Sequence, residues 1–456
     1  MLARPLLIFF LAFAFTPSLS LAQDDFFSDI EVDVDSANAS ISDKPWSITG
    51  WLKEKVAYGL KDPGQAFSRE HADFNKVETS VFSRLDWQLG DALAMRVSAK
   101  ISADAIYQLK DEDSFHQDEV DEFETRFELK DFYLESQFTD SLYLKGGQQV
   151  LAWGQAENVR VVDLINTQDR FTFGQQDLED LRLPVPALLT SLSQSSWVFD
   201  GVVTFKAGSD DIAPALDEFD PYVNFRNNGI YLSSQDPDNE LEFLIRASTH
   251  YQSGDFSIVI ADVNENSLSV DSIDFIGMQT LVEFNQDRFK ALGMSVNWTG
   301  GSWLVFSDMG VHFDKALQPN GNSIFQFTNG WLEKDQFLFA AGIEYSGWNQ
   351  WVLTFEADYI NTMDHDSRLQ VDRNQLGFSG RFRWDGMNDR IQILGVWSQL
   401  PDDNGRIARL SVDYEWSDAL EFGLLWVDYR ADASSLLGNF RNNDVLQLQL
   451  AYSFQH

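Results

Sequence analysis

The feature that most constrains this chain is an alternation of apolar and polar side chains that recurs to its end. Within residues 77–89, Val77, Val81 and Leu85 fall at alternate positions, with Glu78 and Arg84 at the intervening ones. Because successive side chains of a strand point to opposite faces, such a segment predicts a β-strand with one apolar and one polar face. The chain is therefore expected to be all-β.

Short turns alternate with long connections between these segments. Tight turns are expected at 90–91, 139–140, 300–301, 347–348 and 417–418, and long, polar, acidic connections at 60–73, 108–122, 314–335, 361–372 and 430–443. Outer-membrane barrels have short periplasmic turns and longer outside loops. A soluble propeller or sandwich also has alternating strands. Segments such as 75–89 nevertheless match the tilted membrane span of about 9–11 residues better than the usual 5–6.

Aromatic residues mark the ends of these segments beside the short turns. They are Trp87, Trp298, Trp303, Tyr345, Trp348, Trp351, Trp384, Tyr414 and Trp416. Aromatic girdles lie at the membrane interfaces of outer-membrane barrels. The last segment also alternates and carries Phe454 near its end, which resembles the terminal signal that the barrel-assembly machinery reads.

Counting the segments predicts an antiparallel transmembrane β-barrel over residues 46–454, with about 18 strands and both termini periplasmic. The expected strands are 46–59, 75–89, 92–107, 123–138, 141–153, 197–206, 223–234, 239–251, 255–263, 288–298, 302–313, 336–345, 349–360, 373–384, 389–398, 406–416, 419–429 and 444–454. The count falls to 16 if region 207–287 contributes fewer strands. Side chains of the wall do not fill so wide a barrel, and its lumen can hold water or a plug.

The N-terminal residues predict export. Residues 1–22 combine Arg4, an apolar run too short to span a bilayer, and a small-residue cleavage site, as in a cleaved signal peptide. The alternative is an N-terminal anchor helix, which the short run disfavours. Residues 23–45 are expected to form a flexible acidic periplasmic segment. The predicted location is the outer membrane of a Gram-negative bacterium.

Composition excludes several functions. The chain has no cysteine, which rules out disulfides and cysteine-based sites. Its formal charge is −38, with 71 acidic against 33 basic residues, so nucleic acid is not an expected partner. No esterase elbow, zinc-protease motif or phosphate-binding loop is present. We therefore expect no enzyme, no cofactor and no metal site.

One stretch in the middle of the chain carries a family resemblance. It contains Gly147, Gln149, Trp153 and Gly154, then Asp163-Leu164-Ile165-Asn166-Thr167-Gln168-Asp169, then Leu183-Pro184-Val185-Pro186. This pattern resembles the domain-of-unknown-function 1302 family of Gram-negative outer-membrane barrels, whose clan includes the bacterial alginate exporter with eighteen strands. Gln148 and Thr167 depart from the Arg and Pro that the family usually has. The resemblance implies a passive conduit, in some members linked to inner-membrane transporters and lipid-like cargo.

Residues 154–196 are the longest expected connection, and their composition is mixed. They hold apolar residues together with Arg160, Asp163, Asn166, Asp169, Arg170 and Arg182. We expect this loop to fold into the lumen and form the constriction, because long loops in compact folds are often functional. The alternative is an ordinary outside loop with local salt bridges.

The polar faces of the strands place charges of both signs toward the lumen. The expected lumen residues include Glu356, Arg381, Arg383, Arg409 and Asp413. Facing rows of charge orient polar solutes and favour a hydrated path; alternatively these pairs only brace the wall.

These patterns predict an outer-membrane channel or conduit that passes a polar or amphipathic solute. The first alternative is an occluded barrel acting as a surface receptor or envelope scaffold, and a lesser one is a barrel lipid hydrolase. Expected partners are outer-membrane lipid, lipopolysaccharide, and a periplasmic or inner-membrane transport protein.

Overall fold

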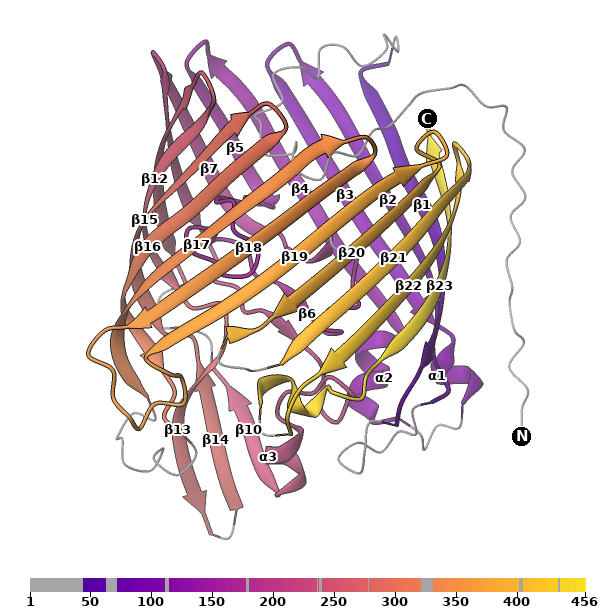
Figure 1. Cartoon of the computed structure of the whole chain (residues 1–456), viewed down its shortest axis with the longest axis vertical. Helices are drawn as coiled ribbons and strands as arrows, with labels where there is room; N and C mark the ends of the chain where they lie inside the picture. Colours follow the sequence, from indigo (N-terminus) through magenta and orange to yellow (C-terminus); the bar gives the residue numbers. More distant parts are fainter. Residues whose placement is uncertain are drawn as a thin grey trace.

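The computed structural model describes residues 44–62, 72–110, 115–177, 180–235, 237, 240–277, 279–320, 331–401, 405–433 and 435–456. Within these residues, an 18-stranded antiparallel sheet closes on itself, because the first strand pairs with the last (Figure 1). The predicted barrel is therefore confirmed. The expected signal peptide, and nearly all of the expected periplasmic segment, lie outside the described residues.

The wall strands are β1 (Trp46–Gly59), β2 (Phe74–Gly90), β3 (Leu93–Asp104), β4 (Thr125–Thr139), β5 (Leu142–Gln149), β7 (Val185–Gln194), β8 (Trp197–Thr204), β11 (Glu242–Tyr251), β12 (Gly254–Asn264), β15 (Arg288–Gly300), β16 (Trp303–Leu317), β17 (Leu332–Trp348), β18 (Trp351–Thr362), β19 (Asn374–Gly386), β20 (Ile391–Gln399), β21 (Arg406–Ser417), β22 (Leu420–Arg430) and β23 (Val445–Gln455). The other elements are the helices α1 (Ile106–Leu109), α2 (Gln117–Phe123) and α3 (Val223–Asn227), the 3-10 turn η7 (Leu436–Asn439), and the strands β6 (Asp169–Arg170), β9 (Asp211–Ile212), β10 (Ile230–Ser234), β13 (Ser269–Ile276) and β14 (Gln279–Asn285). No described helix has the length and apolarity needed to cross a membrane.

The two ends of the barrel differ as the sequence predicts. Two-residue turns such as 91–92 and 140–141 lie at the end that carries the C-terminus, at the top of Figure 1. The described parts of the long connections lie at the opposite end, together with α1, α2, α3 and a three-stranded sheet of β10, β14 and β13. By the rule for bacterial barrels, we expect the first end to face the periplasm and the second the outside.

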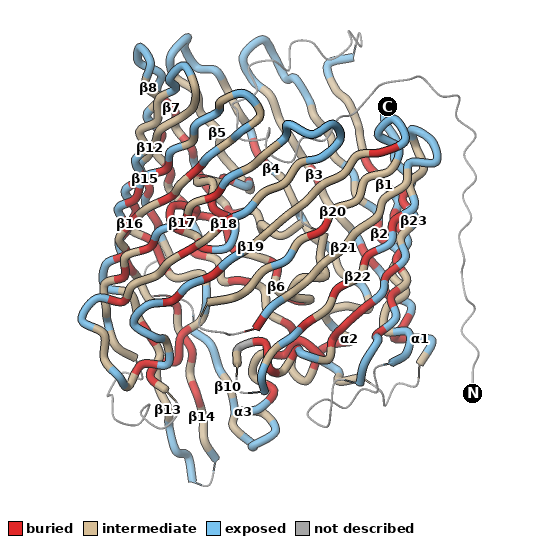
Figure 2. Tube along the Cα trace, viewed as in Figure 1, coloured by how far each residue is buried: buried red, intermediate tan, exposed pale blue. Residues whose placement is uncertain are grey.

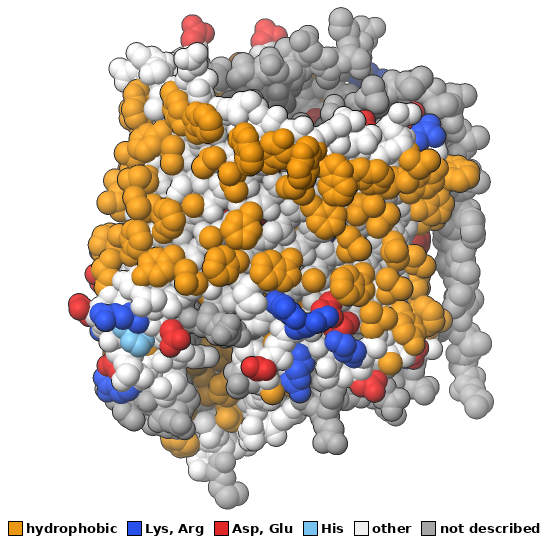
Figure 3. Space-filling view, in the orientation of Figure 1, with side chains coloured by type: hydrophobic (Ala, Val, Ile, Leu, Met, Phe, Trp, Pro, Cys, Tyr) orange, Lys and Arg blue, Asp and Glu red, His pale blue; other side chains and the backbone are white. Residues whose placement is uncertain are grey.

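The outer surface carries the apolar rows of the strands. Figure 3 shows hydrophobic side chains in a band across the visible face of the barrel, with charged side chains gathered near its lower end. The aromatic residues beside the short turns form contacts across neighbouring strands. Trp303 and Tyr345 have ring centroids 4.4 Å apart, and Trp351 and Trp384 are 6.3 Å apart. The expected girdle is therefore present.

The expected strand list is wrong at two places, although the total of eighteen agrees. Residues 185–194, expected in a loop, form the wall strand β7, which turns at 195–196 into β8. Residues 223–234, expected to be a wall strand, form α3 and then β10, which belongs to the separate three-stranded sheet. The wall has one strand that was not expected and lacks one that was, so the total stays at eighteen and the strands from β11 onward keep their expected directions.

The interior contains a second layer of packing. The largest buried cluster joins residues of 151–165, such as Val161 and Ile165, to inward residues of β7 to β18, such as Val259 and Ala340. Figure 2 shows buried positions gathered along this half of the wall and around the outer end. The barrel is thus partly filled by its own chain.

Candidate functional site

The candidate site is the lumen and the chain that crosses it between β5 and β7. We call residues 150–184, of which 178 and 179 are not described, the inner segment. The expected loop of 154–196 is thus shorter than predicted, because its last part is β7 and the turn into β8. The inner segment begins after β5 and ends before β7, and these two strands are neighbours in the wall.

Two glycines and a buried amide start the inner segment. Gly147 has φ +136 and a Cβ there would lie 2.2 Å from the carbonyl oxygen of Phe132. Gln149 is fully buried, and its Nε2 donates to the carbonyl of Ala187 at 2.8 Å. Gly154 has φ +97, a left-handed conformation that only glycine adopts without strain. The family-motif residues thus shape the point where the strand becomes the inner segment.

Trp153 and Asn166 hold the two ends of the segment's first half. Trp153 is 4 % exposed, and the guanidinium of Arg246 lies 4.7 Å from its ring centroid. The Oδ1 of Asn166 accepts from the backbone N–H of Leu151 at 2.8 Å, and its Nδ2 donates to the carbonyl of Leu183 at 2.7 Å. This fully buried side chain ties the start of the segment to its end.

Backbone amides of the segment dock on two wall carboxylates. Asp308 of β16 accepts from the N–H groups of Gln155 and Ala156 at 2.8 and 2.9 Å. Glu356 of β18 accepts from the N–H groups of residues 157 and 158, at 3.1 Å for the shortest contact with each. Consecutive N–H groups make a favourable anion site, because hydrogen bonds to an ionised acceptor are stronger than neutral ones. We call this the amide anchor.

Side-chain carboxylates dock the other half of the segment on lysines. Asp177 accepts from Lys53 and Lys55 of β1 at 2.9 and 3.0 Å. Asp180 lies 2.8 Å from Lys100 of β3 and 3.1 Å from Lys130 of β4. We call this set the lysine anchor.

The pKa values of the two aspartates reflect these lysines. Burial alone would raise the pKa of Asp177, but Lys55 and Lys53 hold it well below its usual range. The pKa of Asp180 is likewise lowered, because Lys100 and Lys130 outweigh the effect of burial. Both carboxyl groups are therefore charged at neutral pH.

The two anchors lie on opposite walls. Counting along the closed sheet, β16 and β18 are separated from β1 and β3 by about half of the strands in either direction. Between the anchors, the carbonyl of Phe173 accepts from the hydroxyl of Tyr429 on β22, at 2.5 Å. Arg409 of β21 donates to the carbonyl of Gln176 at 2.5 Å. The segment therefore crosses the lumen and returns along the wall.

The structure places the charged residues that were expected at the constriction in three places. Asp163 lies between Arg160 and Arg182, with N–O separations of 3.8 and 3.1 Å, so these three residues meet within the segment. Burial lowers the pKa of Arg160, despite the nearby Asp163. Arg170 instead pairs with Asp210, the residue before β9, at 3.0 Å.

Asp169 lies in a third place, on the side of β4. Its carboxylate is 3.9 Å from Arg126, which is also 3.3 Å from Asp211. Burial raises the pKa of Asp169. Burial also raises the pKa of Asp211 to about 6, although Arg126 opposes the shift. This pair of carboxyl groups thus shares one arginine.

The expected wall residues face inward but do not form one cluster. Arg381 reaches Glu157 of the segment at 3.2 Å and Glu344 of β17 at 3.7 Å. Arg383 pairs with Asp385 of its own strand at 3.0 Å. Asp413 follows Arg409 on the inward row of β21 and packs over Gly423 of β22.

Asp308 and the lysines of β1 are not among the residues that the sequence predicts for the constriction. Lys53 and Lys55 are on the polar face of an expected strand, as is Asp308. Their position predicts that they face the lumen. Nothing in the sequence shows that they bind the inner segment, because that contact joins residues far apart in the chain.

Charge is distributed unevenly around the lumen. Lysines and arginines gather on β1–β5 (Lys53, Lys55, Lys76, Arg84, Arg96, Lys100, Arg126, Lys130, Lys145), interspersed with fewer carboxylates. The facing strands β16–β18 present Asp308, Glu344, Glu356 and Asp358. Among the described residues, no group of three or more histidine or acidic side chains is placed to hold a metal ion.

The comparisons with known proteins agree with this architecture. The family model described as "Protein of unknown function (DUF1302)" matches residues 4–454. No curated protein matches the chain by sequence.

Solved structures share the barrel at very low sequence identity. The outer membrane protein OpdK from Pseudomonas aeruginosa aligns with a TM-score of 0.50 and 8% identity, over 90% of this chain and 99% of that one. OccK8 (OprE) of the same organism and OccAB2 from Acinetobacter baumannii each give a TM-score of 0.51 and 8% identity, over 90% of this chain and 98% of theirs. At this identity, the likeness shows a shared outer-membrane barrel fold.

Proposed function

The chain belongs to the DUF1302 family, and we propose that it is an outer-membrane channel that passes a polar or amphipathic solute. The observation that carries the proposal is the inner segment, which crosses the lumen between two charged anchors on opposite walls. A wide barrel without such a segment would be a non-selective pore. A docked segment narrows the path and lines it with polar groups.

The charge distribution gives this channel a means of selection. Cations gather on β1–β5 and carboxylates face them from β16–β18, so a transverse field crosses the narrowed region. Such a field aligns dipolar and charged solutes, whereas a purely apolar solute gains nothing from it. A polar solute, or the polar end of an amphipathic one, is therefore the cargo that fits.

The solved neighbours suggest a first probe. One solved structure is of the neighbour OpdK with vanillate, a small aromatic acid. Its carboxylate would align in the transverse field. We use vanillate as a probe of this channel and assign no natural substrate from it.

An occluded receptor or scaffold is the second candidate function. The dense anchoring of the inner segment favours it, and so does the three-stranded sheet that projects from the outside end (Figure 1). A barrel hydrolase has less support. His312 is 2 % exposed and its Nε2 contacts the carbonyl oxygen of Val161 at 2.9 Å, so this histidine supports the inner segment.

The test is ion conductance of the refolded full-length protein in planar bilayers. We expect discrete steps that vanillate interrupts. We also expect a larger conductance after residues 160–176 are replaced by a short glycine–serine linker. A folded, heat-modifiable barrel that never conducts, with or without the replacement, would contradict the channel and favour the receptor.

A transport partner belongs to the same proposal. The family resemblance implies an inner-membrane transporter, and the short-turn end of the barrel is the face such a partner would meet. Co-purification from membranes of the native host, with and without a cross-linker, tests it. Lipopolysaccharide is the expected neighbour at the outside rim, where exposed Arg430 pairs with Asp428 at 2.8 Å.

A further inference from the structure

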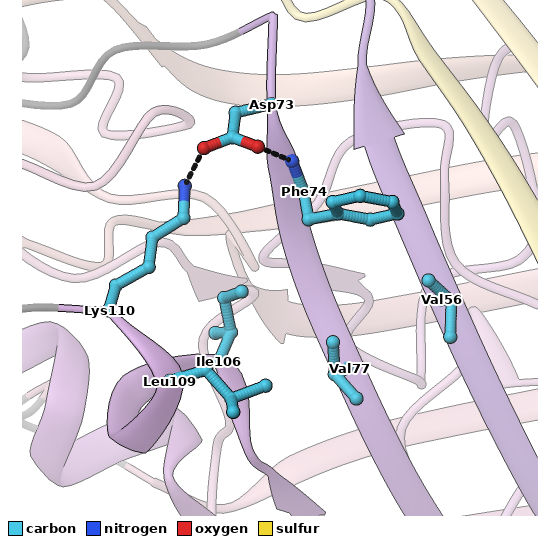
Figure 4. Close-up of a pocket in the computed structure, with 7 residues that line it drawn as sticks. All are labelled: Val56, Asp73, Phe74, Val77, Ile106, Leu109 and Lys110. Atoms are coloured by element: carbon cyan, nitrogen blue, oxygen red, sulfur yellow. Dashed lines mark hydrogen bonds and ion pairs between the residues drawn. The ribbon is translucent and has the colours of Figure 1, made fainter.

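A hollow of about 440 Å³ lies outside the lumen, between the wall and helix α1 (Figure 4). Val56 of β1 and Val77 of β2 form one side of it, and Ile106 and Leu109 of α1 form another. At its outer end, Asp73 and Lys110 form an ion pair at 3.2 Å. Pockets of this volume, apolar with a few polar groups, are the usual sites for small ligands.

The register of the strands shows that this hollow opens toward the lipid. Val56 pairs with Val77, and four residues further into the membrane Leu52 pairs with Val81. Leu52 and Val81 are exposed on the outer surface. Because side chains alternate, Val56 and Val77 lie on the same face. Leu109 is 67% exposed, so the hollow is not sealed by α1.

A carboxylate lies between these two apolar rows. Glu54 pairs with Thr79 in the register, and both face outward. The Thr79 hydroxyl donates to the two carboxylate oxygens at 2.9 and 2.8 Å. Among the described residues, the ion pairs include no cation for Glu54. Ionisable groups on lipid-facing strands are costly and are a reason to look for a function.

The distances along the strands set the spacing of these features. Neighbouring residues on the same face of a strand are two positions apart, which is about 6.7 Å along the strand. Glu54 is therefore about 7 Å along the strand from Val56 and about 13 Å from the rim row of Tyr58 and Phe74, on the side nearer the membrane centre. The Glu54 carboxylate, which has unused lone pairs, therefore lies at a fixed distance from the apolar hollow.

We propose that this face binds a lipid-derived amphiphile from the outer leaflet, with an alkyl chain in the hollow and a hydrogen-bond donor part-way along that chain on Glu54. The alkyl chain covers Val56, Val77, Ile106 and Leu109. The head group lies at the rim near Lys110. A hydroxyl or amide N–H on the chain supplies the second hydrogen bond that the Glu54 carboxylate can accept. This site is separate from the lumen and does not depend on the channel proposal.

A matched pair of fatty acids tests the proposal. The probes are stearate and the hydroxystearate that carries its hydroxyl in mid-chain, added to full-length protein in detergent and counted by native mass spectrometry. We expect the wild type to bind hydroxystearate about tenfold more tightly than stearate, the effect of one hydrogen bond to a charged group. Glu54→Leu should bind both probes equally.

Two further variants test whether binding requires the hollow or occurs anywhere on the lipid-facing surface. Val77→Trp fills the hollow and should lose both probes. Leu85→Trp adds the same side chain on the same outward row of β2, away from the hollow, and should bind as the wild type does. Heat-modifiability on gels checks that each variant is folded.

Two results would overturn the site. If Val77→Trp binds stearate as the wild type does, the hollow is not where the chain lies. If wild type shows no preference for hydroxystearate, or Glu54→Leu keeps that preference, Glu54 is not the acceptor.

Discussion

The lysine anchor gives the most direct test of how the inner segment is held. Asp177→Asn keeps the shape of the side chain and removes the charge that pairs with Lys53 and Lys55. The two lysine side chains are 9% exposed and the aspartate is 16% exposed, so the substitution removes a charge that two nearly buried ammonium groups share. Losing one partner of a buried pair costs about 3–5 kcal/mol.

This cost falls on the equilibrium between the docked and undocked inner segment. Asp180 still binds Lys100 and Lys130, and Arg409 still binds the carbonyl of Gln176, so the segment keeps other attachments. We therefore use the lower value, about 3 kcal/mol, for the local docking equilibrium. It raises the undocked population about 100-fold, since about 1.4 kcal/mol is a factor of ten.

Single-channel recording measures this effect. We expect Asp177→Asn to show frequent brief transitions to a larger conductance that the wild type rarely shows. The control is Asp91→Asn, which makes the same chemical change in a short turn at the periplasmic end. Since Lys55 and Lys53 hold the pKa of Asp177 well below its usual range, its stabilising charge is present at pH 5 as at pH 7 and is lost only in stronger acid. Recordings of Asp177→Asn that match the wild type in conductance and noise would refute this anchoring.

Three further predictions concern the rest of the lumen. Gly154→Ala puts a side chain on a left-handed residue, and its Cβ would lie 2.8 Å from Oδ2 of Asp308. We expect this variant to lower the stability of the barrel to heat by about 1–3 kcal/mol. The control is Gly201→Ala, which has open space around its Cβ and should leave the stability unchanged. Asp308→Ala leaves two backbone N–H groups without an acceptor, so proteolysis of the inner segment in the folded barrel should speed up at least tenfold. Since the pKa of Asp211 is about 6, this carboxyl is charged at pH 7 and neutral at pH 5; cation selectivity should fall as the pH is lowered over that interval, and should fall less in Asp211→Asn than in the wild type.

The barrel could be predicted because its physics is local. Alternation of side chains, aromatic residues beside short turns and the lengths of connections each depend on residues close together in the chain. These signals placed most wall strands within a few residues of their observed bounds. The overall topology then follows from pairing each strand with the next.

Strand β7 was missed because its inner face is not exposed to water. Val185, Ala187 and Leu189 face inward and are buried against the inner segment, while Leu188 and Leu192 face the lipid. Both faces are apolar, so the period-two signal vanishes. The error at 223–234 has the opposite cause, because Ile230 and Leu232 alternate with polar residues in a sheet that lies outside the wall.

The constriction residues were only partly predictable for a related reason. Composition identified Arg160, Asp163 and Arg182 as residues of an inserted segment, and the structure brings them together. The contacts of Glu356 with residues 157 and 158 join positions about 200 residues apart, and no local pattern encodes them. The sequence thus predicts the residue types of the lumen but not their pairing.

The two anchors together determine the direction in which the inner segment can dock. The amide anchor presents backbone N–H groups to wall carboxylates, and the lysine anchor presents carboxylates to wall lysines. A reversed arrangement would bring Asp177 and Asp180 against Asp308 and Glu356, which like-charge repulsion disfavours. The uneven charge of the wall therefore both orients the segment and sets the transverse field that the proposed solute meets. If the two roles share the same residues, variants that weaken an anchor should change ion selectivity and conductance together; a change in conductance alone would place the solute path away from the anchors.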